Sequence, residues 1–91
     1  MERQVVIVGC ARTPIGSFSG TLKDFKAYSL GAMAIREAIN RSGIQDNLID
    51  EVIMGNILQT EARGNPAREA VLEAGLPIEI PAFTVNKNCI C

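Results

Sequence analysis

Short runs of apolar residues alternate along this chain with longer segments in which apolar residues recur every three or four positions. Residues 5–8 read Val-Val-Ile-Val and are followed by Gly9. Four β-branched residues without polar alternation are typical of a strand buried on both faces of an α/β sheet. Two further runs, at 51–54 and 81–85, have the length and composition of strands. The pattern therefore predicts three strands.

The segment between the first two strands predicts a helix preceded by a long connection. Residues 10–27 contain Pro14 and Gly16, which favour a loop. A loop of this length with apolar residues of its own usually folds back on the protein or serves a site. Residues 29–42 have helical spacing, and Gly43 stands where the helix would end. The apolar stripe of this helix consists of Tyr28, Ala32, Ile35 and Ile39.

The second predicted helix has clear signals at both ends. Asn65 suits the N-cap, Pro66 suits the first helical position, and Gly75 marks the end. The order of elements is then β-α-β-α-β, which implies parallel strands joined by right-handed crossovers. We therefore expect an α/β fold, in which layered helices cover a sheet and a single domain covers residues 1–91.

Composition mainly excludes whole classes of function. The chain has 91 residues, 47% of them apolar, and a net charge of −1. It is therefore neither disordered by composition nor basic enough for nucleic acid. No apolar run reaches the ~18 residues of a membrane span, and the chain start lacks the apolar stretch of a secretory signal. Three cysteines, an odd number, fit a reducing compartment. We expect a cytoplasmic protein without nucleic-acid or membrane partners.

The strongest chemical candidate is Cys89, which follows the third predicted strand. In open parallel sheets, active sites gather beyond the carboxyl ends of the strands. The three predicted strands bring Cys10, Asn56 and residues 86–89 to such ends. A cysteine between a strand and a helix N-terminus is well placed for a lowered thiol pKa. The chain has no histidine to act as its base. The spacing leaves two interpretations of Cys89 open, a nucleophile and a buried, unreactive thiol.

Three weaker candidate sites are also present. Residues 9–16 fail as a phosphate loop because their glycine spacing is wrong. Cys10, Cys89 and Cys91 are too few for structural zinc, which takes four ligands. Cys10 is instead expected to pack as a small hydrophobic residue after the first strand. The charged residues beside the second helix are interpreted as solvated surface; they are Glu61, Arg63, Arg68 and Glu69.

Several segments together resemble the thiolase family. Residues 5–16, VVIVGCARTPIG, are similar to the opening strand and Arg-Thr-Pro turn of thiolases. Residues 55–59 and 65–68 read GNILQ and NPAR, which are similar to the family's G-N-V-L-Q and N-P-A-R segments. Residues 74–77, AGLP, continue the match, and residues 84–89, TVNKNC, resemble the segment that holds the nucleophile. The resemblance covers nearly the whole chain in family order and is greatest to the acetyl-CoA acetyltransferase branch.

This resemblance implies a fold and a reaction. The fold is the first part of a thiolase N-terminal domain, whose family has two halves of order βαβαβαββ. Cys89 would attack the thioester of an acyl-CoA and become an acyl-cysteine. The carbanion of a second acetyl-CoA would then attack the acyl group to give acetoacetyl-CoA, and the reverse reaction would be thiolysis. Acetyl-CoA and acetoacetyl-CoA are then substrates, and no metal or tightly bound cofactor is implied. A homodimer or homotetramer is implied for the full-length protein.

The resemblance also places part of the catalytic machinery outside these residues. The family's activating histidine and second cysteine lie in its C-terminal half, and neither Cys10 nor Cys91 matches that cysteine. Ile90 and Cys91 replace the small residues that normally follow the nucleophile, which suggests a truncated sequence. We expect the isolated chain to be inactive and not stably folded, because strand 81–85 would lack its covering helix. The rival is a non-catalytic α/β interaction module, or a vestigial fragment, that pairs with a thiolase-like subunit.

Overall fold

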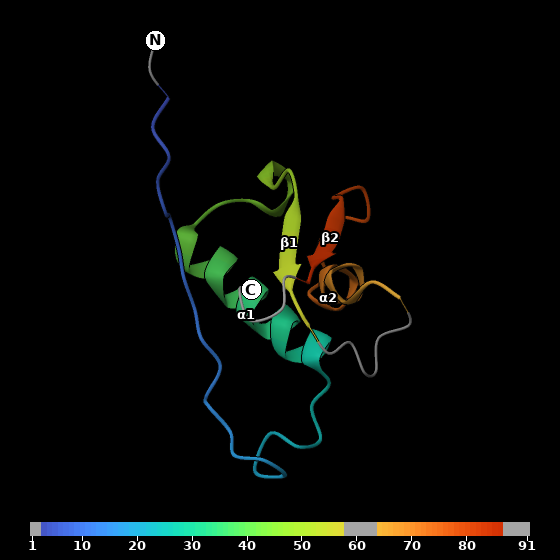
Figure 1. Cartoon of the computed structure of the whole chain (residues 1–91). Helices are drawn as coiled ribbons and strands as arrows, with labels where there is room; N and C mark the ends of the chain where they lie inside the picture. Colours follow the sequence, from blue (N-terminus) through green and yellow to red (C-terminus); the bar gives the residue numbers. More distant parts are fainter. Residues whose placement is uncertain (1–2, 58–63, 87–91) are drawn as a thin grey trace.

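The described part of the chain is a mixed α/β arrangement of two helices, one short 3₁₀ turn and two strands (Figure 1). It is a computed structural model that describes residues 3–57 and 64–86. Along the chain the elements are α1 (Ala27–Ser42), η1 (Asp46–Leu48), β1 (Val52–Gly55), α2 (Pro66–Glu73) and β2 (Ala82–Val85). Both predicted helices are present, and their bounds lie within two residues of those expected from the sequence pattern.

The two strands lie side by side and run parallel. Val52 is opposite Ala82, and the register continues to Gly55 opposite Val85. Helix α2 lies between the strands in sequence, so β1, α2 and β2 form a strand–helix–strand unit (Figure 1). The predicted second and third strands and their parallel direction are therefore confirmed.

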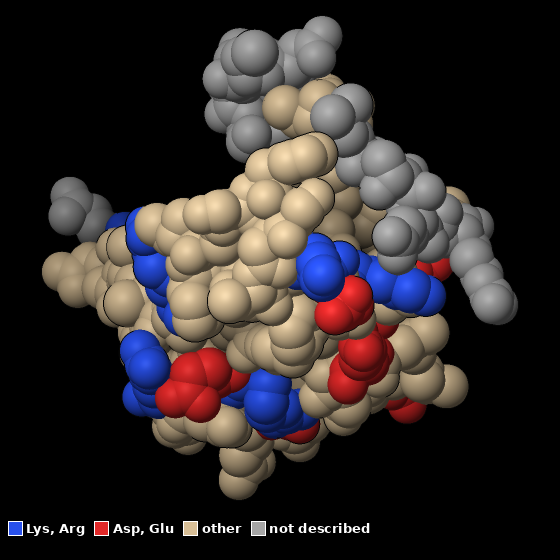
Figure 2. Space-filling view, turned by 90° about the horizontal axis from the view of Figure 1, so that it is seen from below, with Lys and Arg blue, Asp and Glu red and all other residues tan. Residues whose placement is uncertain are grey.

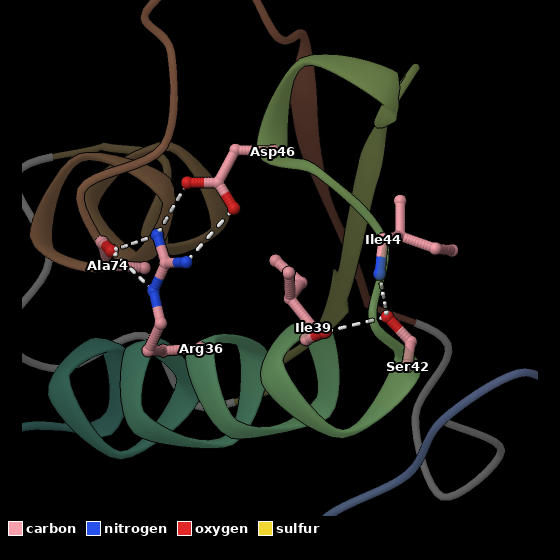
Figure 3. A network of polar contacts seen from close by, with 6 residues as sticks. All are labelled: Arg36, Ile39, Ser42, Ile44, Asp46 and Ala74. Carbon is pink, nitrogen blue, oxygen red and sulfur yellow. Dashed lines mark hydrogen bonds and ion pairs between the residues drawn. The ribbon is translucent and has the colours of Figure 1, made fainter.

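Local signals explain where α1 ends. Gly43 has φ 75°, a left-handed conformation that glycine adopts without steric cost, and its N–H donates to Ile39 O at 3.2 Å. The Ser42 hydroxyl donates to Ile39 O at 2.7 Å and accepts from the Ile44 N–H at 3.1 Å (Figure 3). These bonds satisfy groups that the helix end leaves without intrahelical partners. The predicted stop at Gly43 is confirmed.

The hydrophobic core lies between the helices and one face of the sheet. Val71 of α2 is fully buried, and Leu76 and Ile80 pack with it. Partly buried apolar residues from α1, both strands and the connections surround these three: Ile35, Ile39, Ile49, Val52, Ala74 and Ala82. The predicted stripe on α1 therefore faces the core, as its spacing indicated.

The opposite face of the sheet is open within the described residues. Ile53 and Phe83 are neighbours in the strand register and are 60% and 43% exposed. Side chains alternate between the two faces of a strand, so residues on the helix side are covered while these two are not. An apolar sheet face of this kind requires a further layer for burial.

The predicted first strand is absent from the structure. Residues 5–8 form no strand, and their exposed fractions run from 55% at Val8 to 98% at Val5. The segment is extended and passes along α1 (Figure 1). There, a Cβ on Gly9 would lie 2.6 Å from Ala38 O. A buried strand needs a neighbouring strand to pair its backbone and further elements to cover its faces. Among the described residues, no strand pairs with residues 5–8. The helices and strands of the described residues therefore follow the order α-β-α-β rather than the predicted β-α-β-α-β.

Cys10 also differs from the expectation. It is exposed rather than packed as a small hydrophobic residue. Its backbone carbonyl accepts a hydrogen bond from Arg41 Nη1 at 3.3 Å. The prediction of burial depended on a buried strand before Cys10, and that strand is not formed.

Arg36 of α1 holds the helices and the 3₁₀ turn together (Figure 3). Its Nη1 and Nη2 donate to the two carboxylate oxygens of Asp46, both at 3.0 Å. Its Nε and Nη2 also donate to the Ala74 carbonyl, at 3.1 and 2.8 Å, at the C-terminal end of α2. The hydrogen bonds from Arg36 hold the pKa of Asp46 below its ordinary value, and the same bonds raise the pKa of Arg36.

This network predicts a pH-dependent contribution to stability. Because the folded-state pKa of Asp46 is lowered, its contribution is present above the ordinary carboxyl range and is lost as pH falls through the folded value. In a folded protein that contains this chain, Asp46→Asn should therefore lower the melting temperature at pH 6, and this difference should shrink on acidification below about pH 4. Melting followed by circular dichroism at both pH values tests this.

Glu37→Gln is the matched control. Glu37 pairs with Arg41 at 2.9 Å across one turn of α1, and both side chains are at least half exposed. Exposed pairs of this kind contribute little. We expect almost no change at either pH. An equal loss in the two variants would contradict a special role for the Arg36 network.

Candidate functional site

The carboxyl ends of β1 and β2 lie together, as the parallel arrangement requires. The Asn56 N–H donates to Val85 O at 3.0 Å, just beyond the last paired residues. Asn86 Nδ2 donates to Ile57 O at 3.1 Å. Two of the three predicted strand ends therefore meet at one edge of the sheet. The third predicted strand end, at Cys10, lies against α1 instead, where the Cys10 carbonyl accepts a hydrogen bond from Arg41.

Cys89 lies outside the described residues, as do Cys91 and the rest of 87–91. Its role as a nucleophile is therefore still a prediction. The structure does describe what precedes it: β2 ends at Val85, and Asn86 stands three positions before Cys89 in the sequence. The described part of the site therefore ends at Asn86.

A hydrogen-bond network joins two residues of β2, Ala82 and Thr84, to the start of α2. The Thr84 hydroxyl donates to Asn65 Oδ1 at 2.6 Å and accepts from the Ala67 N–H at 3.0 Å. Asn65 Nδ2 donates to Ala82 O at 3.0 Å, and Asn65 Oδ1 also accepts from the Arg68 N–H at 3.4 Å. Asn65 is thus the predicted N-cap of α2 and also a bridge to the strand.

Sequence reasoning missed Thr84. Pro66 has no N–H, so the first free N–H of α2 belongs to Ala67, which is fully buried. A buried N–H needs an acceptor, and Thr84 supplies it. The available signal was a threonine at an inward position of the strand, beside a helix that opens with Asn-Pro.

The start of α2 is consequently closed to an anion. The N–H groups of Ala67 and Arg68 bond to the side chains of Thr84 and Asn65, and the Glu69 N–H donates to Asn65 O at 3.1 Å. Free N–H groups are what make a helix N-terminus a phosphate site. Here they are occupied by the protein itself, so their role is structural.

Arg68 is not the solvated side chain that was predicted. It is only partly exposed, and its Nη1 and Nη2 donate to Ile80 O at 2.9 Å and Ile78 O at 2.7 Å. The turn before β2 presents these carbonyls, and the guanidinium satisfies both. Glu69 is also partly exposed, while Glu61 and Arg63 lie outside the described residues. Arg68 is therefore committed to backbone carbonyls rather than available for acid–base chemistry.

The described residues show neither a metal-ligand cluster nor a membrane-spanning helix, and the face in Figure 2 shows no basic patch. On the face shown in Figure 2, basic and acidic residues are interspersed, with no continuous basic patch. Within residues 3–57 and 64–86, no three Cys, Asp or Glu side chains cluster as metal ligands would. In the same ranges, no helix has the length and apolar character needed to cross a membrane.

Comparisons with known proteins agree on one family. A family profile described as "Thiolase, N-terminal domain" matches residues 5–91. The acetyl-CoA acetyltransferase of Syntrophomonas wolfei is 52% identical over 89 residues, which are 98% of this chain. A probable acetyl-CoA acyltransferase of Staphylococcus aureus is 51% identical over 86 residues. The crystal structure of the Bacillus anthracis acetyl-CoA acetyltransferase superposes with a TM-score of 0.86 at 37% identity, over 92% of this chain.

The coverage of those proteins is small. The chain spans 22% of the Syntrophomonas and Staphylococcus proteins and 21% of the Bacillus chain. The match nevertheless includes both the sequence and the arrangement of helices and parallel strands described above. The chain therefore belongs to the thiolase family, whose N-terminal-domain profile it matches over residues 5–91.

Proposed function

We propose that the chain is the acyl-accepting segment of an acetyl-CoA acetyltransferase, with Cys89 as the nucleophile. One observation carries this proposal: the parallel strands β1 and β2 end side by side, and Cys89 follows the last residue of β2 by four positions in the sequence. The Asn56 and Asn86 bonds at 3.0 and 3.1 Å fix this edge. Family membership supports the same role, because the Syntrophomonas relative is named acetyl-CoA acetyltransferase and the Staphylococcus relative probable acetyl-CoA acyltransferase.

The proposed reaction has two steps. In the first, the Cys89 thiolate attacks the carbonyl carbon of acetyl-CoA, the new S–C bond forms, and the bond to CoA breaks. In the second, a base removes a proton from the α-carbon of another acetyl-CoA, and that carbon attacks the acetyl-cysteine. A C–C bond forms, the S–C bond to Cys89 breaks, and acetoacetyl-CoA is released. Covalent catalysis divides one difficult transfer into two easier ones.

Other groups required by this scheme come from outside the chain. It contains no histidine, so the base that activates Cys89 is proposed to lie elsewhere in the complete enzyme. We propose no metal or prosthetic group, because coenzyme A thioesters are the substrates. A homodimer or homotetramer is proposed as the working form. The exposed faces of Ile53 and Phe83 support the need for a further layer, from the same or another chain.

The relative reactivity of two thiols tests the proposal. We define the chimera as the Syntrophomonas wolfei enzyme in which this chain replaces the segment that it matches. A nucleophilic cysteine needs a lowered pKa, so Cys89 should react with iodoacetamide at least about tenfold faster than Cys10 at pH 7. Cys10 is exposed and serves as an internal reference. Peptide mass mapping gives both rates, and acetyl-CoA should protect only Cys89.

Two outcomes would contradict the proposal. Equal, slow labelling of both thiols without protection would favour the interaction module, in which Cys89 is unreactive. Turnover of acetyl-CoA by the isolated chain would show that the scheme assigns the wrong groups, because it places the base and the second proton-transfer group elsewhere.

A further inference from the structure

We propose that Thr84, together with Asn65, is a positioning residue for Cys89, because it fixes the carboxyl end of β2. This inference rests on the proposed function. Thr84 is the third of the four residues of β2 and lies five positions before Cys89. It is near enough in sequence to set the direction in which the chain leaves the sheet, yet its hydroxyl is used entirely within the protein.

The Thr84 hydroxyl joins two elements with one atom. It donates to Asn65 Oδ1 at 2.6 Å and accepts from the Ala67 N–H at 3.0 Å. A hydroxyl can do both, whereas the methyl groups of valine can do neither. Serine retains both bonds. Comparing valine with serine at position 84 therefore distinguishes the effect of the hydroxyl from the effect of side-chain shape.

Asn65 extends the attachment along the strand. Its Nδ2 donates to Ala82 O at 3.0 Å, so one amide bonds to two residues of β2. On the other side of the strand, the Asn56 N–H bonds to Val85 O and Asn86 Nδ2 bonds to Ile57 O. The end of β2 is therefore held from α2 and from the segment that follows β1.

The turn that precedes β2 is held by a different side chain, that of Arg68. Arg68 donates to Ile78 O and Ile80 O, at 2.7 and 2.9 Å. Like the Thr84 hydroxyl, the Arg68 guanidinium makes two hydrogen bonds, and these link α2 to residues 78–80. It acts at the end away from Cys89. Arg68 is thus a matched control that separates a general loss of stability from a loss of positioning.

Positioning of this kind has a kinetic signature. Reacting atoms must be held in a near-attack arrangement, and a shift of about 1 Å can cost about 10²-fold in rate. If Thr84 sets the path to Cys89, its loss should lower kcat and the rate of cysteine acetylation. KM should change little, because Thr84 makes no contact with substrate in this scheme.

The experiment compares Thr84→Val, Thr84→Ser and Arg68→Met in the chimera. We expect Thr84→Val to lower kcat between about 10- and 100-fold with KM unchanged. Thr84→Ser should restore most of the activity. Arg68→Met should lower the melting temperature while the folded enzyme keeps the kcat of the parent chimera. Steady-state kinetics, melting temperature and the pH profile of Cys89 alkylation are measured for each.

Two results would overturn the inference. One is a Thr84→Val chimera with the parent's kcat and the parent's alkylation profile. The other is a loss of kcat that follows melting temperature equally in Thr84→Val and Arg68→Met, since this would show a merely structural role. Failure of the proposed function looks different, because Cys89 of the parent chimera would then not be acetylated at all. If the parent is acetylated and Thr84→Val is acetylated equally fast, only the inference fails.

Discussion

Replacing Cys89 by serine in the chimera is expected to lower kcat for acetoacetyl-CoA formation by at least about 10³-fold. The proposed first step forms a bond between the Cys89 sulfur and the acetyl carbon. A serine hydroxyl at neutral pH is a much weaker nucleophile than a cysteine thiol, which already has some thiolate. Without the acetyl-enzyme the second step has no electrophile. Spectroscopic detection of acetoacetyl-CoA in steady state gives the rates.

Cys10→Ser is the control for this prediction. Cys10 is exposed and bonds to Arg41 only through its backbone carbonyl, which serine retains. We therefore expect turnover close to that of the parent chimera. A Cys89→Ser chimera that keeps its activity, or a comparable loss in both variants, would remove Cys89 from the proposed mechanism.

Val71→Ala is expected to shift the urea unfolding transition of the chimera clearly to lower urea concentration. Val71 is fully buried at the centre of the core, and its truncation should cost about 2 kcal/mol in lost burial and cavity formation. The described core is small: of its six buried apolar residues, three are alanines. A core of this size supplies only about 3–5 kcal/mol. Urea unfolding at low temperature, followed by circular dichroism, measures the change.

Leu72→Ala is the matched control on the same helix. Leu72 follows Val71 directly but is 49% exposed. Alanine has at least as high a helix propensity as leucine, so the change should stay within about 0.5 kcal/mol. A loss as large as that of Val71→Ala would mean that the core does not lie where the structure places it.

The elements that the sequence predicts well are those with local signals. The N-cap Asn65, the Pro66 at the first helical position and the left-handed Gly43 fix helix ends through contacts a few residues away. Strands β1 and β2 are short apolar runs with such helices between them, and both are found parallel and adjacent. Their positions follow from the pattern because each is paired within the chain.

Residues 5–8 show the limit of the same reasoning. Their β-branched sequence indicates a buried strand, but burial depends on a neighbour that local pattern does not identify. Within the described residues no strand pairs with them, and Val5 is 98% exposed. Cys10 was misjudged for the same reason, because its predicted burial depended on that strand.

The contacts around β2 were also beyond sequence reasoning. Thr84 and Asn65 are 19 positions apart, and Arg68 is 10 and 12 positions from the carbonyls that it contacts. Nothing in the local pattern distinguishes a threonine that accepts from a helix N–H from one that faces water. The network becomes visible only when α2 is placed against the strand.

If Cys89 accepts the acyl group, the acetylated cysteine should be detectable by mass spectrometry. The chimera is incubated with acetyl-CoA alone, quenched in acid and digested, and the mass of each cysteine peptide is determined. We expect one acetyl group on the peptide that contains Cys89 and none on the peptide that contains Cys10. An unmodified Cys89 in a chimera that still forms acetoacetyl-CoA would contradict it.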